Sequence, residues 1–166
     1  MVTTNCLTGR SEYLTETQDR QRACDLARAS SSLPYVSKIT WIDGTPMLDG
    51  GIVDSIPIKR AQATGHEHNV VITTRNFGYR EPGHDRKQPM FIYRHYPRLR
   101  VALSHRIQTY NEQLQMVENL ERDGKITVIR PLRKMEVRRI EKNTSKLEQL
   151  YEEGFRLGDE FCESHL

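Results

Sequence analysis

The chain has 166 residues, of which 36% are hydrophobic, and its 25 basic and 22 acidic side chains leave a net charge of +3. This balance argues against a dedicated nucleic-acid-binding protein, and no apolar run approaches the roughly 20 residues that a membrane-spanning helix needs. The three cysteines are widely spaced and follow no metal-ligand pattern, so with no secretory signal in view we expect reduced thiols and a cytoplasmic protein.

The N-terminal third of the chain predicts a β-hairpin and then a helix. Residues 2–6 and 12–14 have strand character and flank a turn at residues 8–10. Thr15 and Gln18 form a capping box that predicts a helix up to about residue 29.

A second hairpin and a short helix should follow. Residues 39–42 and 46–48 flank Asp43 and Gly44, a pair typical of tight hairpin turns. Ser55 is a plausible N-cap for a short helix that ends near Gly65.

The second half of the chain alternates strands with helices. The β-branched run at residues 69–74 predicts a strand buried on both faces, and residues 126–129 predict another. A long helix is expected at residues 96–122, where apolar residues recur at three- and four-residue steps and should face the core. These residues are Leu99, Leu103, Ile107, Tyr110, Leu114, Val117 and Leu120.

A last helix should begin at the capping box of Ser145 and Glu148. Its inner face is expected to carry Leu147, Tyr151, Phe155 and Phe161. Strands that alternate with helices predict an α/β layered fold with a mostly parallel sheet.

Several segments in order carry a resemblance to a known family. They are Ala29-Ser30-Ser31-Ser32-Leu33-Pro34, Leu48-Asp49-Gly50-Gly51, Ser55-Ile56-Pro57-Ile58, Arg94-His95-Tyr96-Pro97 and Ile129-Arg130-Pro131. Together they resemble the C-terminal part of a bacterial patatin-like phospholipase. The resemblance implies a partial three-layer α/β/α sandwich. Residues 1–80 would be the C-terminal half of the catalytic domain, and residues 81–166 an extension packed on it as a single compact unit.

The resemblance also implies a Ser–Asp dyad, of which only the aspartate is present. It corresponds to Asp49, with Gly50 and Gly51 supporting the catalytic loop. The family's glycine-rich oxyanion loop and Gly-x-Ser-x-Gly elbow do not occur in this sequence. The hydroxyls of Ser30, Ser31, Ser32 and Ser55 are explained better by helix ends than by nucleophilic elbows. We therefore expect the chain alone to be inactive.

A basic stretch between residues 75 and 106 is the other candidate site. A solvated or internally ion-paired surface is the default interpretation, and contact of Arg75, Arg80, Arg86 and Lys87 with an anionic lipid is the alternative. His66, Glu67 and His68 suggest a metal site but have no third ligand at a convincing spacing, so no metal and no cofactor are expected.

Two functions remain open at this stage. The resemblance implies part of an esterase or phospholipase acting on a lipid or small acyl ester, with peripheral membrane contact at most and no nucleic-acid partner. The alternative is a non-catalytic module that binds protein, anionic membrane or RNA through its basic loop and long helix. In either case we expect self-association or pairing with a missing N-terminal half, because a partial sheet leaves an edge uncovered.

Overall fold

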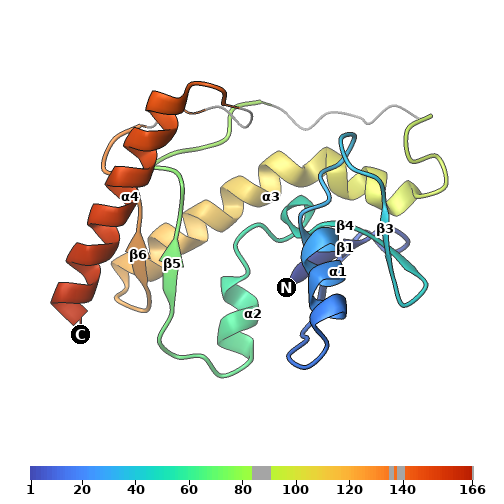
Figure 1. The fold of residues 1–166 in the computed structure, drawn as a ribbon, viewed down its shortest axis with the longest axis horizontal. Coiled ribbons are helices and arrows are strands. Elements are labelled where there is room, and N and C mark those ends of the chain that lie inside the picture. Colours follow the sequence, from blue (N-terminus) through green and yellow to red (C-terminus); the bar gives the residue numbers. More distant parts are fainter. Residues whose placement is uncertain (84–90, 135–136, 138–140, 166) are drawn as a thin grey trace. The chain divides into compact units, whose positions relative to one another are not determined.

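The computed structural model describes residues 1–83, 91–134, 137 and 141–165 (Figure 1). The chain forms two compact units, one from Met1–Pro57 with Glu81–Gln113 and one from Ile58–Arg80 with Leu114–Leu166. Each unit is therefore built from two separate stretches of chain. The predicted division into a catalytic-domain part at residues 1–80 and an extension at residues 81–166 stays a prediction. Within the described residues, no helix combines the length and the apolar character needed to cross a membrane.

The first unit contains a four-stranded sheet with the order β2-β1-β4-β3. The strands are β1 (Val2–Asn5), β2 (Arg10–Tyr13), β3 (Thr40–Ile42) and β4 (Thr45–Asp49). Every neighbouring pair is antiparallel. Both predicted hairpins are confirmed, but the expectation of a mostly parallel sheet is wrong for this unit. Short hairpin connections account for the antiparallel pairs β1–β2 and β3–β4, while β1 and β4 pair across a long stretch of chain that includes α1.

The turn between β3 and β4 shows why this hairpin could be predicted. Asp43 has φ of 49° and Gly44 has φ of 73°. Two successive positive φ values define the turn whose twist matches that of paired strands, and Asp-Gly is among the few dipeptides that adopt it at little cost.

Helix α1 (Arg20–Ser30) begins later than its predicted capping box. The carboxylate of Glu16 instead accepts the backbone N–H groups of Thr17, Gln18 and Asp19 and forms a turn. Asp19 then caps the helix by accepting from the N–H of Arg22 at 3.0 Å. The helix buries Leu26 and Ala29 in a small cluster with Ile42 and Met47 of the sheet.

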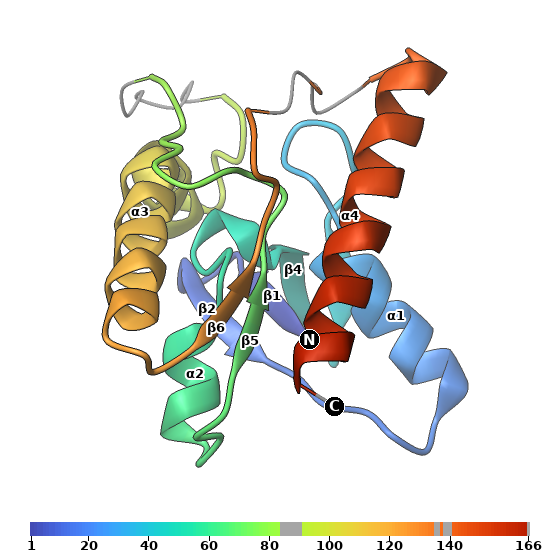
Figure 2. The ribbon, with the colours of Figure 1, turned by 90° about the vertical axis from the view of Figure 1, so that its left-hand side faces the viewer.

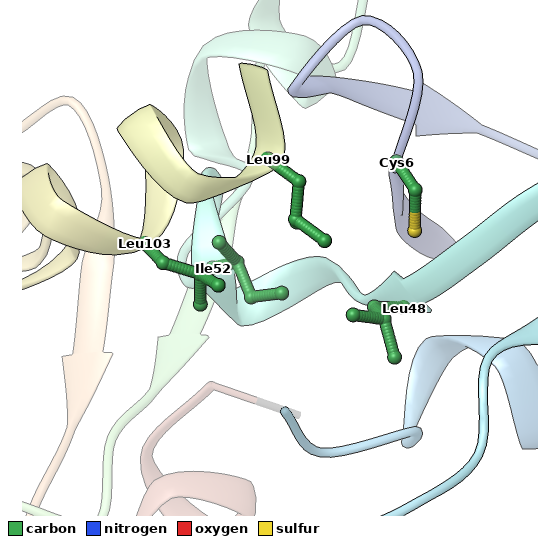
Figure 3. Packing of buried hydrophobic residues seen from close by; sticks show 5 residues of the cluster. All are labelled: Cys6, Leu48, Ile52, Leu99 and Leu103. Atoms are coloured by element: carbon green, nitrogen blue, oxygen red, sulfur yellow. The ribbon is translucent and has the colours of Figure 1, made fainter. Parts of the chain in front are cut away.

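The main core of this unit joins the sheet to the long helix. Leu99 and Leu103 of α3 (Pro97–Arg122) pack with Cys6, Leu48 and Ile52 (Figure 3). The long helix is confirmed to within one residue of its predicted start. Burial raises the pKa of Cys6 to about 12, so its thiol stays protonated at neutral pH and acts as a small apolar side chain rather than a nucleophile.

The second unit contains a two-stranded parallel sheet of β5 (Val70–Ile72) and β6 (Thr127–Ile129), seen side by side in Figures 1 and 2. The prediction that β5 is buried on both faces is wrong in this structure. Val71 is buried, but Val70 is 49% exposed and Ile72 is 75% exposed. A parallel pair normally has both faces covered, so β5 presents apolar surface that this unit leaves open.

The second unit also contains helices α2 and α4 and the C-terminal part of α3. Helix α2 (Ile58–Ala63) starts three residues after Ser55, which is therefore not its N-cap. Helix α4 (Thr144–His165) is capped by Asn143, whose Oδ1 accepts from the N–H of Ser145 at 3.1 Å, so the predicted capping box is displaced.

The expected inner face of α4 is largely exposed. Leu147, Tyr151 and Phe155 have exposed fractions of 42%, 69% and 60%. The Tyr151 and Phe155 rings contact each other at a centroid distance of 6.2 Å. The spacing predicted the helix correctly but not its environment.

Candidate active site

Asp49 is the last residue of β4, and its backbone is held from three sides. It pairs with Thr3 of β1 in the sheet register. Its N–H donates to the carbonyl of Ser32 at 2.9 Å, and its carbonyl accepts from the Thr4 hydroxyl at 2.8 Å. The two threonines and Ser32 are buried, so the strand end that carries the carboxylate is rigidly placed.

The Asp49 carboxylate is oriented through one of its two oxygens. Its Oδ1 accepts from the N–H of Gly51 at 2.6 Å and so caps the short 3₁₀ helix Gly50–Ile52. The residue is partly exposed, and among the described residues the carboxylate forms no ion pair and Oδ2 accepts no hydrogen bond. A carboxylate fixed by one oxygen keeps its second oxygen for a proton from an incoming hydroxyl.

Space is short at the two glycines after Asp49, and far more so at Gly50 than at Gly51. A Cβ on Gly50 would lie 2.4 Å from the carbonyl oxygen of Val2 in β1. A Cβ on Gly51 would lie 3.0 Å from Asp49 Oδ1 and 3.4 Å from Ser55 Oγ. Gly50 therefore lets the loop approach β1, and Gly51 leaves room for the oriented carboxylate.

We expect Gly50→Ala to destabilise the protein by about 3 kcal/mol, because the clash is with backbone that cannot move without breaking the sheet. Urea denaturation followed by circular dichroism measures the change. Gly154→Ala is the matched control, since a Cβ there meets open space within α4. Alanine at position 154 should leave stability equal or raise it by up to about 1 kcal/mol. Equal stability of the two variants would contradict the account of Gly50.

The candidate serines are all engaged with backbone carbonyls. Ser30 donates to Val2 at 2.7 Å and Ser31 to Ala27 at 2.8 Å. Ser32 donates to Arg28 at 2.7 Å and Ser55 to Gly51 at 2.9 Å. None of these bonds is to Asp49. Among the described residues the Asp49 carboxylate therefore has no hydroxyl paired with it, and a nucleophile paired with a base is the minimum requirement for nucleophilic catalysis.

A polar network next to the Asp49 loop was not predicted. Asp54 accepts from the Tyr13 hydroxyl at 2.5 Å and from Gln113 Nε2 at 2.7 Å. Gln113 Oε1 accepts from the backbone N–H groups of Ser55 at 3.0 Å and Ile56 at 3.2 Å. Gln113 is 58 residues from Ser55 and 57 residues from Ile56 in the sequence, and no local sequence pattern predicts a contact over such a separation.

Two arginines of the basic stretch, Arg75 and Arg80, interact with other side chains of the protein. Both Nη atoms of Arg80 bond the carboxylate of Glu118, at 2.9 and 2.7 Å, and Glu118 also accepts from the N–H of Gly78. The guanidinium of Arg75 stacks on Tyr79 at 4.9 Å. Arg86 and Lys87 lie outside the described residues. Arg80 therefore forms an internal ion pair, which was one of the two possibilities considered for the basic stretch. Contact of the basic stretch with an anion or a lipid stays a prediction.

The Arg80–Glu118 pair should make stability depend on pH. The guanidinium of Arg80, helped by the N–H of Gly78, holds the pKa of Glu118 below its ordinary value. A carboxyl whose pKa is lowered by folding stabilises the protein above its unfolded-state pKa and loses that contribution as pH falls through the folded-state value. We expect Glu118→Gln to cost about 2 kcal/mol at pH 7.

Urea denaturation at pH 7 and at pH 3 checks this expectation. The difference between wild type and Glu118→Gln should shrink at the lower pH, because the lowered pKa of Glu118 contributes less stability once the unfolded-state carboxyl is protonated. Glu112→Gln is the control on the same helix, because Glu112 is exposed and accepts only from Gln108 among the described residues. An equal difference at both pH values would contradict the ion-pair account.

The segment from His66 to His68 is exposed throughout. Over residues 1–83, 91–134, 137 and 141–164, no group of three or more His, Cys, Asp or Glu side chains could hold a metal ion. The described geometry therefore gives no support to the metal hypothesis that the His-Glu-His pattern suggested.

Comparisons with known proteins match two parts of the chain. Residues 7–61 match the family of patatin-like phospholipases, and this segment contains Asp49, Gly50 and Gly51. Residues 96–166 match a domain of unknown function, DUF6363, which spans α3, β6 and α4. No curated protein matches the chain. The first match supports the patatin family, and with it a family of lipid hydrolases, for the N-terminal segment.

Proposed function

We propose that this chain is part of a patatin-like lipid acyl hydrolase in which Asp49 is the general base. The serine that it activates would come from a polypeptide segment outside these 166 residues. The observation that carries the proposal is the geometry of Asp49, with Oδ1 held by Gly51 N–H at 2.6 Å, within the segment that matches the patatin-like family.

The chemistry assigned to Asp49 is proton transfer in two directions. Its Oδ2 would accept the serine proton as the serine oxygen attacks the ester carbonyl, and it would return that proton to the departing alcohol. In the second half of the reaction the same oxygen would take a proton from water, whose oxygen attacks the acyl-serine. The bond between the acyl carbon and the serine oxygen then breaks, Asp49 returns the proton to that oxygen, and the free carboxylic acid leaves with the serine hydroxyl restored.

Rigid placement is what makes a weak base useful in this scheme. The Thr4 hydroxyl holds the backbone of Asp49 and the N–H of Gly51 holds its carboxylate, so little reorganisation is needed when a hydroxyl docks. The same proposal has three further parts. The substrate is a lipid or a small acyl ester, and the chain forms the C-terminal part of the enzyme. The complete sheet has a three-layer α/β/α arrangement.

Complementation tests the proposal. A segment bearing a glycine-rich loop and a Gly-x-Ser-x-Gly elbow from a patatin-like enzyme is co-expressed with this chain, and hydrolysis of p-nitrophenyl esters is measured. We expect turnover that requires both the elbow serine and Asp49. A soluble complex that stays inert towards short- and long-chain esters would overturn the proposal.

A further inference from the structure

The side-chain amide of Gln113 holds the segment that follows the Asp49 loop through both of its polar atoms. Its oxygen accepts from the N–H groups of Ser55 and Ile56, at 3.0 and 3.2 Å. Its nitrogen donates to Asp54 Oδ1 at 2.7 Å, while the Tyr13 hydroxyl holds Oδ2. One side chain that satisfies three groups of one segment fixes that segment more firmly than separate bonds would.

Hydrogen bonds continue from this segment back to the carboxylate. The Ser55 hydroxyl donates to the carbonyl of Gly51 at 2.9 Å, and the N–H of Gly51 donates to Asp49 Oδ1 at 2.6 Å. The N–H of Asp54 also donates to the carbonyl of Gly50 at 2.9 Å. Residues 49–56 are therefore linked by a chain of hydrogen bonds. The Asp49 carboxylate lies at one end of this chain, and the contact with Gln113 of α3 lies at the other.

The chemistry of the contact fits glutamine specifically. The site needs an acceptor for two N–H groups and a donor for a carboxylate, and a primary amide supplies both. Glutamate would keep the acceptor but place a second carboxylate against Asp54. A side chain without polar atoms would leave two N–H groups and one carboxylate oxygen unpaired in a half-buried place.

Asn111, on the same helix, also bonds backbone groups through both polar atoms of its side-chain amide. Its Oδ1 accepts from the N–H of Glu81 at 2.7 Å, and its Nδ2 donates to the carbonyl of Glu81 at 3.1 Å. Amides that bond the backbone of neighbouring loops thus recur on α3, which opens the segment matching DUF6363.

We propose that Gln113 is a positioning residue that holds the Asp49 loop in its working geometry, and that bracing this loop is one role of the α3 segment of the DUF6363 region. The structural part of the inference concerns the loop alone. Its catalytic consequence rests on the proposed function.

Amide hydrogen exchange, followed by NMR on the full chain, tests the structural part. In Gln113→Met, which keeps the length of the side chain and removes its hydrogen bonds, the amides of Ser55 and Ile56 should exchange about tenfold faster, and that of Gly51 should also accelerate. Gln113→Glu retains the acceptor but places a second carboxylate against Asp54, so the Ser55 and Ile56 amides should exchange faster than in wild type and more slowly than in Gln113→Met. Gln108→Met is the control, because Gln108 is exposed on the same helix and bonds Glu112.

The outcomes separate a local brace from general stability. The amide of Cys6, which donates to the carbonyl of Pro46 at 2.9 Å, should be unaffected in Gln113→Met. Unchanged exchange at Ser55, Ile56 and Gly51 would overturn the inference, and so would an equal acceleration at Cys6, since the effect would then be global.

Kinetics of the complemented enzyme test the catalytic part. We expect Gln113→Met to lower kcat between about tenfold and a hundredfold with KM unchanged, because a misplaced base slows the chemical step more than it weakens binding. An unchanged kcat in an active complex would overturn the positioning role. If the wild-type complex is itself inert, the proposed function fails, while the exchange experiment still decides whether Gln113 braces the loop.

Discussion

The 166-residue chain alone is expected to hydrolyse p-nitrophenyl acyl esters no faster than buffer does. The reason is that no hydroxyl of the described residues is paired with Asp49, since the candidate serines at the end of α1 and in the Asp49 loop donate to backbone carbonyls. Removal of the nucleophile from a hydrolytic site costs a factor on the order of 10⁶ in rate. This factor corresponds to roughly 8 kcal/mol of activation free energy, and no other described group stands in the nucleophile's place.

Substitution controls distinguish true inactivity from a replacement nucleophile. Wild type, Asp49→Ala and Ser55→Ala are compared at equal concentration, with the folded state of each checked by circular dichroism. Equal background rates for all three are expected. Turnover in the wild type that disappears in Asp49→Ala would show that a nucleophile is present within the chain, and the proposed function would have to be revised.

Local signals in the sequence predicted much of the secondary structure. The Asp43–Gly44 turn and the apolar spacing of α3 identified a hairpin and a helix nearly at their observed bounds. Both signals act over a few residues and depend on backbone geometry and one apolar face. Helix starts were less predictable, because Asp19 and Asn143 compete with the capping boxes at Thr15 and Ser145.

Burial was the weakest part of the prediction. The apolar run at β5 and the aromatic spacing of α4 both indicated buried faces, yet Ile72 and Tyr151 are largely exposed. A sequence pattern shows which face of an element is apolar, but it does not show whether another element covers that face.

The candidate site was predictable only in part. Asp49 and its glycines were identified from the order of motifs that resembles a family, and the close approach of Gly50 to Val2 gives that order a steric reason. Gln113 and Tyr13 were missed, because each reaches Asp54 across a long stretch of chain. A glutamine on an amphipathic helix is ordinarily a solvated residue, and only the fold shows that its amide meets backbone N–H groups.

In the complemented enzyme, we expect Asp49→Asn to lower kcat by about 10⁴-fold with little change in KM. Asparagine preserves the size of the side chain, and its oxygen can still accept from the N–H of Gly51. The group turned towards the serine then becomes an NH₂, which donates hydrogen bonds and cannot take up the serine proton. The substitution therefore removes proton transfer and leaves the shape of the loop intact.

Asp43→Asn provides the matched control for charge and side-chain type. Asp43 is an exposed hairpin residue that pairs with Arg22 at 2.7 Å, and asparagine tolerates its positive φ. Its kcat should stay within about twofold of wild type, because a surface charge outside the site does not enter the chemical step. If Asp49→Asn kept more than about a tenth of the wild-type kcat, the dominant base would have to be another group. The oriented carboxylate would then serve only as the cap of the 3₁₀ helix Gly50–Ile52.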